Sequence, residues 1–539
     1  MTRLTARVQH RDVVLAIIVL FALVTFAPAP GSDLPKVSVT TYHNGIARQG
    51  VNAAETILTP ANVNPRKFGK LFSQGVDGSV YAQPLYVSDL YVPGKGIHNV
   101  VFVATQHGSL YAFDADSNKG TNAAPIWKDS FVDASSGVST VSSDDVACGD
   151  IIPEIGITGT PVIDPDSRTL YVVVKTKESG RAVQRLHALD IATGTEQMGG
   201  PIVIDGAVRG KGAGSSNGWM IFDALHENQR PGLLLQNGMV YISWAAHCDG
   251  WPFHGWVMAY DADTLQQVGI WNSTPDKQGG GIWQSGAAPA GDGEDVYFAT
   301  GNGDFTAAKN GFDFGDSIIR LGWRRGSLRV LDFFTPYDEA NLNAGDIEPG
   351  SGGVVLFSAP KTGHQLAVET SKSGTLYIVD PTHMGRYNAS GNTNIVQSLP
   401  SATGGVWGTP AWWKDTLYVG PSYDTLKAFR FDPDQDLFEA SPVAQGSTSF
   451  RFPGPTPSIS ANGDRNGILW LIQSDGYVED GSAVLRAYDA ANIGQELYSS
   501  SDHPKRDDPG KAVKFSVPTI ANGKVYIGAR DRITVFGLR

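Results

Sequence analysis

Charged residues and cysteine are both scarce in this sequence. Asp, Glu, Lys and Arg make up 18% of the 539 residues, against ~25% in an average globular protein. Only two cysteines occur, Cys148 and Cys248, and neither belongs to a Cys-x-x-Cys-His motif, which excludes covalently attached c-type haem. The formal net charge is −12, so the overall basic character of a nucleic-acid-binding protein is missing as well.

Glycine is abundant instead, and the composition is typical of a turn-rich globular protein. The sequence contains 63 Gly and 31 Pro, and 41% of its residues are hydrophobic. This is enough apolar material for a large core. Disorder, coiled coil and collagen are excluded by the same composition.

The first thirty residues have the pattern of a targeting segment. Three arginines precede an apolar run of 15 residues, Val13 to Ala27, which Pro-Ala-Pro-Gly follows. Such a run fits a secretory signal better than a membrane-spanning helix, which needs ~20 residues. The sequence predicts export to the periplasm or the medium, with residues 1–30 as a signal peptide. A proline shortly after the apolar run hinders cleavage by the signal peptidase, so an uncleaved membrane anchor is the alternative to a signal peptide. Membrane contact is expected only through this segment. In an oxidising compartment Cys148 and Cys248 form one disulfide or remain two unpaired thiols.

A short apolar strand that ends in a turn recurs eight times along the chain. The copies lie about 60 residues apart on average, at residues 110–114, 186–190, 257–261, 318–321, 376–380, 426–430, 485–489 and 533–537. This spacing matches one four-stranded blade of a β-propeller. Strands rich in Val, Ile, Tyr and Leu between Gly, Asp and Pro argue against helices.

The sequence therefore predicts an all-β fold, an eight-bladed propeller over residues 67–539 that follows an N-terminal extension over 31–66. Seven blades are the alternative, because the copy at 318–321 is degenerate. The last copy supplies only three strands, so the strand predicted at 68–72 should close the ring by adding the fourth.

Five segments have distinctive sequences in addition to the apolar strand of the repeat. They are 188–196 (Ala-Leu-Asp-Ile-Ala-Thr-Gly-Thr-Glu), 279–285 (Gly-Gly-Gly-Ile-Trp-Gln-Ser), 296–303 (Val-Tyr-Phe-Ala-Thr-Gly-Asn-Gly), 335–346 (from Thr-Pro-Tyr-Asp-Glu to Asp346) and 370–380 (Thr-Ser-Lys-Ser-Gly-Thr-Leu-Tyr-Ile-Val-Asp). Together they resemble the quinoprotein alcohol dehydrogenases, which use pyrroloquinoline quinone (PQQ). The first resembles the blade motif of that family, and the other four resemble its cofactor-site segments.

The resemblance implies a cofactor site at named positions. Trp283 would be the floor under the quinone, and Lys372 would contact the quinone oxygens. Glu178, Asn302 and Asp346 would bind Ca²⁺, which prefers such oxygen ligands. Asp346 would also be the catalytic base that takes the substrate hydroxyl proton. The expected reaction is oxidation of an alcohol or sugar hydroxyl by hydride transfer to a calcium-bound quinone, and a separate acceptor would take the electrons because no haem motif is present.

Blade topology supports this grouping. The loop between the second and third strands of a blade opens on the same face as the loop between blades. Glu178, Asn302 and Lys372 each follow a second strand, Asp346 lies between blades, and Trp283 heads a first strand. Cys148 and Cys248 lie between blades and after a second strand, respectively. These residues should therefore gather at one mouth of the central channel. The adjacent Cys-Cys pair of the family is missing, and Cys148 stands alone in roughly that region.

Each candidate also has a plain structural interpretation. A tryptophan at the head of an inner strand is commonly a core residue, and Asn302 between two glycines could adopt a left-handed turn. Lys372 and the two acids could be solvated surface residues. The rival function is a non-catalytic PQQ-like propeller that acts as a scaffold for a protein or glycan partner.

Overall fold

The computed structural model describes residues 37–250 and 252–539. The signal or anchor predicted over residues 1–30 lies outside the described residues. Within the described ranges, no helix is long and apolar enough to cross a membrane.

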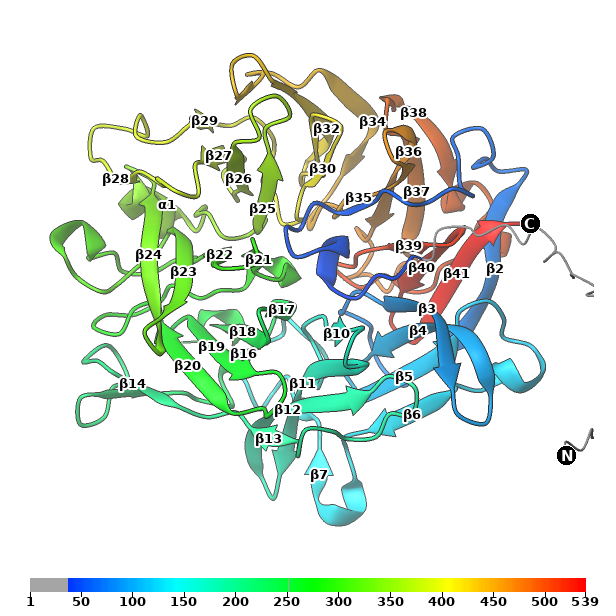
Figure 1. Cartoon of the computed structure of the whole chain (residues 1–539), viewed down its shortest axis with the longest axis horizontal. Helices are drawn as coiled ribbons and strands as arrows, with labels where there is room; N and C mark the ends of the chain where they lie inside the picture. Colours follow the sequence, from blue (N-terminus) through cyan, green and yellow to red (C-terminus); the bar gives the residue numbers. More distant parts are fainter. Residues whose placement is uncertain (1–36, 251) are drawn as a thin grey trace, which may run out of the picture. The chain divides into compact units, whose positions relative to one another are not determined.

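Eight antiparallel sheets succeed one another around a central axis (Figure 1), as predicted. The seven-bladed alternative is excluded, because the degenerate copy at 318–321 lies in a regular strand, β23 (Ile318–Arg324), which pairs on both sides. In each blade the first strand is innermost. Because side chains alternate along each strand, apolar residues are buried between neighbouring sheets. Between blades two and three, for example, Tyr171 packs with Trp244 and Trp256.

The first four blades follow one another from the N-terminal side. Blade one has β3 (Leu85–Val92), β4 (Gly96–Ala104), β5 (Ser109–Asp114) and β6 (Trp127–Ser130). Blade two has β10 (Val162–Asp164), β11 (Thr169–Glu178), β12 (Arg181–Asp190) and β13 (Ile202–Val203), with β7 (Val138–Ser139) added beside β11. Blade three has β17 (Leu234–Gln236), β18 (Met239–Ala246), β19 (Trp256–Asp261) and β20 (Gln267–Asn272), with β16 (Glu227–Asn228) beside β18. Blade four has β21 (Ala290–Gly291), β22 (Val296–Ala299), β23 and β24 (Ser327–Thr335), extended by β28 (Arg386–Tyr387).

The last four blades complete the ring. Blade five has β25 (Val354–Ser358), β26 (Gln365–Thr370), β27 (Leu376–Val379) and β29 (Gln397–Leu399). Blade six has β30 (Ala411–Trp413), β31 (Thr416–Val419), β32 (Asp424–Asp432), β33 (Leu437–Phe438) and β34 (Ala444–Phe450). Blade seven has β35 (Ser458–Asn462), β36 (Arg465–Gln473), β37 (Val484–Asp489) and β38 (Asn492–Ser499). Blade eight has β39 (Thr519–Ala521), β40 (Lys524–Gly528), β41 (Arg532–Leu538) and, as predicted, the N-terminal β2 (Phe68–Gly75) paired with β41.

A segment ahead of the first blade, residues 39–55, laces the inner strands together; we call it the strap. Its hydrogen bonds reach all eight blades, from the Val39–Tyr86 bridge in blade one to the Gly523 N–H of blade eight, which donates to Glu55. Between these ends it contacts the intervening inner strands, and β1 (Val51–Asn52) pairs in parallel with β35. The dark-blue segment at the centre of Figure 1 is this strap. The sequence predicts only an N-terminal extension here, whereas in the structure this segment lies along the inner strands of the propeller.

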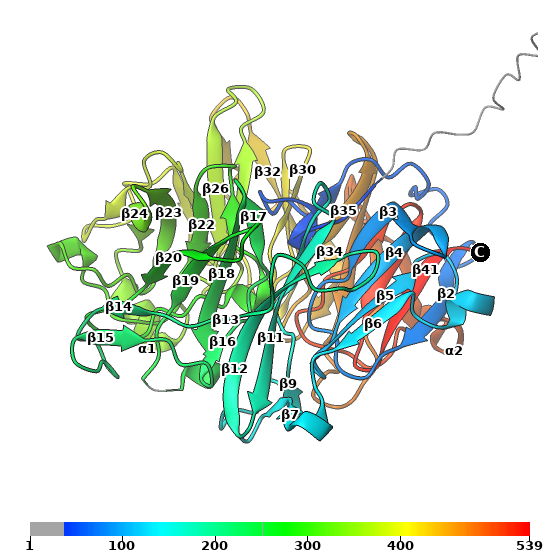
Figure 2. The same ribbon diagram turned by 60° about the horizontal axis from the view of Figure 1, so that its bottom comes forward.

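Short elements between blades mark one end of the propeller. β7, β9 (Glu154–Ile155), α1 (Glu339–Gly345) and α2 (Pro504–Asp507) all lie toward the lower side of Figure 2. Each belongs to a connection between successive blades. The loops between second and third strands open on the same side, and we call this end the mouth.

Candidate functional site

Loops from several blades surround a cavity of about 190 Å³ at the mouth. The loops after β18, β22 and β26 contribute Cys248, Asn302 and Lys372. The connections between blades contribute Arg230, Trp283 and Asp346. The cavity therefore collects side chains that lie far apart in the sequence.

Four of the five residues singled out by sequence line this cavity together. The Asn302 side-chain amide donates a hydrogen bond to Asp346 Oδ1 at 2.7 Å. The Lys372 ammonium donates to the same oxygen at 2.5 Å and lies 5.6 Å from the centre of the Trp283 ring. Trp283 is partly exposed, and it also meets Phe515 edge to face. The chain thus brings an indole, an ammonium, an amide and a carboxylate into direct contact.

Local backbone structure fixes these positions. Asp346 caps α1 in the left-handed conformation, with φ 51°. Asn302 stands between glycines because the neighbouring backbone comes very close: a Cβ on Gly303 would lie 2.2 Å from Gly280 N. Lys372 follows the end of β26 in a tight turn. Asn302 does not itself have a positive φ, so the left-handed-turn interpretation is wrong, whereas its place in the site is clear from its contact with Asp346.

Glu348 belongs to the site and escaped the sequence analysis. Its Oε1 lies 2.8 Å from Lys372 Nζ, and its side chain is only 2% exposed. Oε2 is buried without a hydrogen-bond partner among the described residues. Burial raises the pKa of Glu348 to about 7, although the Lys372 charge opposes the shift. The available signal was an acidic residue two positions after Asp346, but Asp346 caps a helix in the left-handed conformation, so no strand alternation marks the pair.

Charge is distributed unevenly between the two carboxyl groups. Burial acts to raise the pKa of Asp346, but hydrogen bonds from Lys372 and Asn302 outweigh it and hold the pKa below its ordinary value. Burial acts to lower the pKa of Lys372, and the facing carboxylates Glu348 and Asp346 raise it instead. At neutral pH the site therefore holds an ionised Asp346, a cationic Lys372 and a Glu348 close to its titration midpoint.

Glu178 does not join this group. It lies at the end of β11, where Arg185 of the neighbouring β12 donates to both of its oxygens, at 2.9 and 2.8 Å. A separate small cavity includes Glu178, Arg185 and Thr176. The hairpin thus supplies Glu178 with its own counter-ion, away from the mouth cavity.

The donor set does not fit a calcium centre. Calcium takes ~6–8 oxygen ligands, and no group of three or more His, Cys, Asp or Glu side chains in the described ranges could hold a metal ion. Lys372 already bridges Asp346 and Glu348. Asn302 Oδ1 and Glu348 Oε2 are buried without a partner among the described residues, but these two oxygens fall well short of the number that calcium takes.

The two cysteines form a disulfide, Cys148–Cys248, with Cα atoms 5.7 Å apart. Cys148 lies in the connection between blades one and two, and Cys248 follows β18 in blade three. Cys248 lines the mouth cavity. The family's adjacent cysteine pair is absent, yet a disulfide stands in the cavity wall.

Arg230 is a second residue that the sequence analysis missed. It is only 4% exposed, and its Nη2 is buried with no hydrogen-bond partner in the described part of the chain. The guanidinium lies 5.5 Å from the Tyr81 ring centre and 5.3 Å from that of Phe515. A cation–π contact contributes up to ~2 kcal/mol, whereas burying an ion costs several kcal/mol. The aromatic rings alone therefore leave this charge undercompensated. No motif marked Arg230, which lies in an irregular connection.

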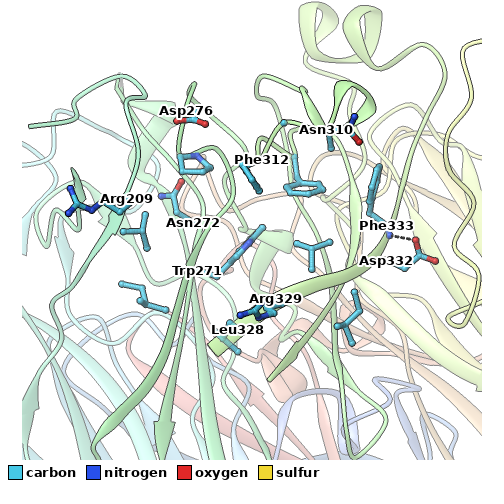
Figure 3. A pocket seen from close by; sticks show the side chains of 18 of the residues that line it. Arg209, Trp271, Asn272, Asp276, Asn310, Phe312, Leu328, Arg329, Asp332 and Phe333 are labelled. Carbon is cyan, nitrogen blue, oxygen red and sulfur yellow. Dashed lines mark hydrogen bonds between the residues drawn. The ribbon is translucent and has the colours of Figure 1, made fainter. Parts of the chain in front are cut away.

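A larger cavity of about 650 Å³ opens elsewhere, between β20 and β24 of blades three and four. Figure 3 shows Trp271 and Phe312 near its centre, and Arg209, Asp276 and Asn310 around them. Phe312 is 67% exposed. None of the residues predicted to bind the cofactor or a metal lines this cavity.

Comparison with known proteins identifies the fold. No family model and no curated protein matches the sequence. Among solved structures, a quinohaemoprotein alcohol dehydrogenase from Comamonas testosteroni matches with a TM-score of 0.58 at 14% identity, covering 93% of this chain and 80% of that chain. One from Pseudomonas putida HK5 gives the same values. A europium-containing methanol dehydrogenase matches with a TM-score of 0.59 at 12% identity, covering 93% of this chain and 98% of that chain. The chain therefore has the β-propeller fold seen in these quinoprotein alcohol and methanol dehydrogenases.

Proposed function

We propose that this protein is an exported, PQQ-dependent oxidoreductase that oxidises an alcohol or sugar hydroxyl at the mouth cavity. The observation that carries the proposal is the convergence of Trp283, Asn302, Asp346 and Lys372 on one cavity. Each comes from a different loop, and each stands in a segment that resembles a cofactor-site segment of the quinoprotein alcohol dehydrogenases. The shared propeller fold supports the same conclusion.

The residues present suit a planar, anionic quinone. Trp283 offers an indole face for stacking, and Arg230 and Lys372 offer positive charge to carboxyl and carbonyl oxygens. At about 190 Å³ the cavity is smaller than the ~300–1,000 Å³ of typical ligand pockets. The bound group would therefore fill the cavity and extend toward the open mouth.

Within this proposal the quinone supplies the hydride acceptor, and the protein supplies position and proton transfer. Ionised Asp346 would accept the proton of the substrate hydroxyl. Glu348 is the second base within reach of Lys372, and its pKa of about 7 suits proton transfer near neutral pH. Lys372 holds both carboxylates in place through its two ion pairs.

Export and a separate electron acceptor complete the proposal. The N-terminal pattern of three arginines and an apolar run supports export, and the disulfide is consistent with an oxidising compartment. Both cysteines of the chain are engaged in that bond and neither belongs to a haem-attachment motif. We therefore propose that electrons leave to another molecule.

A binding scaffold is the second candidate function, and one observation favours it. The cavity between β20 and β24 combines the aromatic side chains Trp271 and Phe312 with polar groups (Figure 3). The Nδ2 of Asn272, which also lines it, is buried and unpartnered in the described structure. Such a surface would suit a glycan, with aromatic faces for sugar rings and an amide for hydroxyl groups.

Calorimetric titration of PQQ into the folded protein tests the proposal. We expect binding by the wild type, and a loss of at least tenfold in affinity in Trp283→Ala, because the stacking surface is removed. Trp323→Ala is the matched control, since Trp323 is an exposed tryptophan on β23 outside the cavity. Binding should then be followed by a screen of alcohols and sugars with an artificial electron acceptor. No binding by a demonstrably folded wild type would contradict the oxidoreductase proposal and leave the scaffold as the better account.

A further inference from the structure

We propose that the mouth cavity binds its anionic cofactor through Arg230 and without a divalent cation, because the chain supplies the positive charge itself. This inference rests on the proposed function. It replaces the calcium ion that the sequence resemblance implied with two residues of the protein.

Arg230 is built into the cavity wall as an unpaired cation. It lines the cavity, and its side chain is buried. No carboxylate of the described residues lies within ion-pair distance of it, although the charge of Asp150 acts on it from farther away, and Nη2 has no hydrogen-bond partner there. Water solvates the guanidinium poorly, because the side chain is 4% exposed and lies against the rings of Tyr81 and Phe515. Gly286 makes room for it: a Cβ at that position would lie 2.5 Å from Arg230 Nη1.

A second buried arginine in the same propeller, Arg48, allows the hydrogen bonding of the two guanidinium groups to be compared. Arg48 of the strap is fully buried, as Arg230 nearly is. Its Nε donates to the Pro289 carbonyl at 2.9 Å, and Nη1 donates to Thr41 Oγ1 and the Tyr42 carbonyl at 2.8 Å each. The fold therefore satisfies a buried guanidinium where its role is structural. The free Nη2 of Arg230, at a cavity wall, instead points to an anionic group of a ligand.

Lys372 occupies the place of a cation between the acids. Its ammonium lies 2.5 Å from Asp346 Oδ1 and 2.8 Å from Glu348 Oε1, so one oxygen of each carboxylate is already bound by a cation of the protein itself. Glu178 is paired with Arg185 instead. A divalent ion at these acids would lie close to the Lys372 ammonium, whose charge repels it.

A third cation reinforces the positive side of the cavity. Lys514 is 6% exposed and forms an ion pair with Asp150, which also lines the cavity. Its ammonium lies 5.6 Å from the Phe515 ring that Arg230 also contacts. Arg230 is the member of this group without a carboxylate partner, so it is the one available to a carboxyl group of PQQ.

Calorimetric titration of PQQ with and without a divalent cation tests this inference. The wild type should bind PQQ with the same affinity, within about twofold, in excess EDTA and in excess Ca²⁺. Arg230→Gln should bind at least tenfold more weakly, because charge-assisted hydrogen bonds to a carboxylate are lost. Arg230→Lys should fall between the two. Arg465→Gln, which removes an exposed arginine on β36, is the control and should bind as the wild type does.

Thermal unfolding without PQQ separates recognition from structure. Removing a buried charge that has no ion-pair partner should leave the melting temperature of Arg230→Gln unchanged or higher. A clearly lower melting temperature, or failure to fold, would assign Arg230 a structural role and overturn the inference.

The binding result distinguishes the two proposals. PQQ binding that requires Ca²⁺, or that ignores Arg230→Gln, would overturn this inference and leave the proposed function standing. Absence of binding by the folded wild type in both buffers would overturn both.

Discussion

At the scale of single residues, the unusual feature is the set of buried carboxyl groups behind the mouth cavity. Glu369 on β26 is 1% exposed and accepts one hydrogen bond, from Gly350 N–H, while its Oε2 has no partner among the described residues. Burial raises the pKa of Glu369 to about 8, with the Gly350 N–H opposing and the Glu348 charge assisting the shift. Glu348 follows the same pattern at about 7. Buried acids of this kind couple folding to proton uptake.

The first prediction at this scale is a loss of stability as the pH rises. The unfolded chain releases the Glu369 proton near pH 4.5, whereas the folded protein keeps it until about pH 8. Between these values the folded state binds more protons, so the free energy of unfolding falls with pH. Glu369→Gln should remove part of this fall and be more stable than the wild type at pH 8 by at least about 1 kcal/mol, since one pKa unit corresponds to ~1.4 kcal/mol. Urea unfolding from pH 5 to pH 8 measures this dependence of stability on pH.

Glu439→Gln, an exposed control, should keep the wild-type dependence of the free energy of unfolding on pH. An unchanged dependence in Glu369→Gln would contradict the prediction.

The same scale shows what the sequence could and could not reveal about the site. Trp283, Asn302 and Lys372 were found because each stands in a short, distinctive segment. Glu178 was assigned by its place after a strand, but its partner Arg185 is set by hairpin pairing, which a motif does not encode. Arg230 lies in the irregular connection before β17, and only the folded structure shows that it meets Tyr81 and Phe515.

At the scale of elements, the strap is the feature that sequence patterns hide. The strands of the repeat are recognisable in the sequence by their apolar residues, and all eight copies show this pattern. The strap instead forms one or two backbone hydrogen bonds with the inner strand of most blades and then continues to the next blade. It therefore lacks the length and periodicity of a predictable strand. Its effect is to fill the edges of the inner strands, which would otherwise stay unpaired.

Two glycines of the strap give a matched test of how tightly it is held. Gly50 has a positive φ of 72°, and a Cβ there would lie 2.4 Å from His43 Nε2. His43 cannot easily give way, because both ring nitrogens lie 2.7 Å from carbonyl oxygens, of Arg48 and Pro457. Gly45 has an extended backbone, and nothing lies within 4 Å of a Cβ at that position.

Gly50→Ala should therefore lower the free energy of unfolding by about 2 kcal/mol or more, through left-handed strain and the clash. Gly45→Ala should change it by less than about 1 kcal/mol, and its effect could be stabilising because the unfolded chain loses freedom. Denaturant unfolding of both variants measures the difference. Equal effects would show that the strap is loosely held and does not bind the inner strands together.

At the scale of the whole propeller, two closures of different kind hold the ring. The first is the strand pairing of β2 with β41, which joins segments from opposite ends of the described chain in blade eight. The need for this closure could be read from the sequence, since the last repeat lacked one strand. The second is the Cys148–Cys248 disulfide, which links the connection after blade one to blade three and so spans blade two. Sequence alone left its formation open, because two cysteines 100 residues apart can pair only if the fold brings them together.

Removing this disulfide should destabilise the propeller without opening the ring. The bond closes a loop of 100 residues, for which loop-entropy estimates give ~4.7 kcal/mol and measurements on native disulfides typically give ~2–5 kcal/mol. We therefore expect the double variant Cys148→Ser/Cys248→Ser to lose about 2–5 kcal/mol in denaturant unfolding. The single variant Cys248→Ser should lose a similar amount, because the bond is broken in both. The far-UV circular dichroism spectrum should not change, since strand pairing in all eight blades is independent of the bond. An unfolding midpoint equal to that of the oxidised wild type would contradict the prediction, and a changed spectrum would show that blade two depends on the disulfide for its place in the ring.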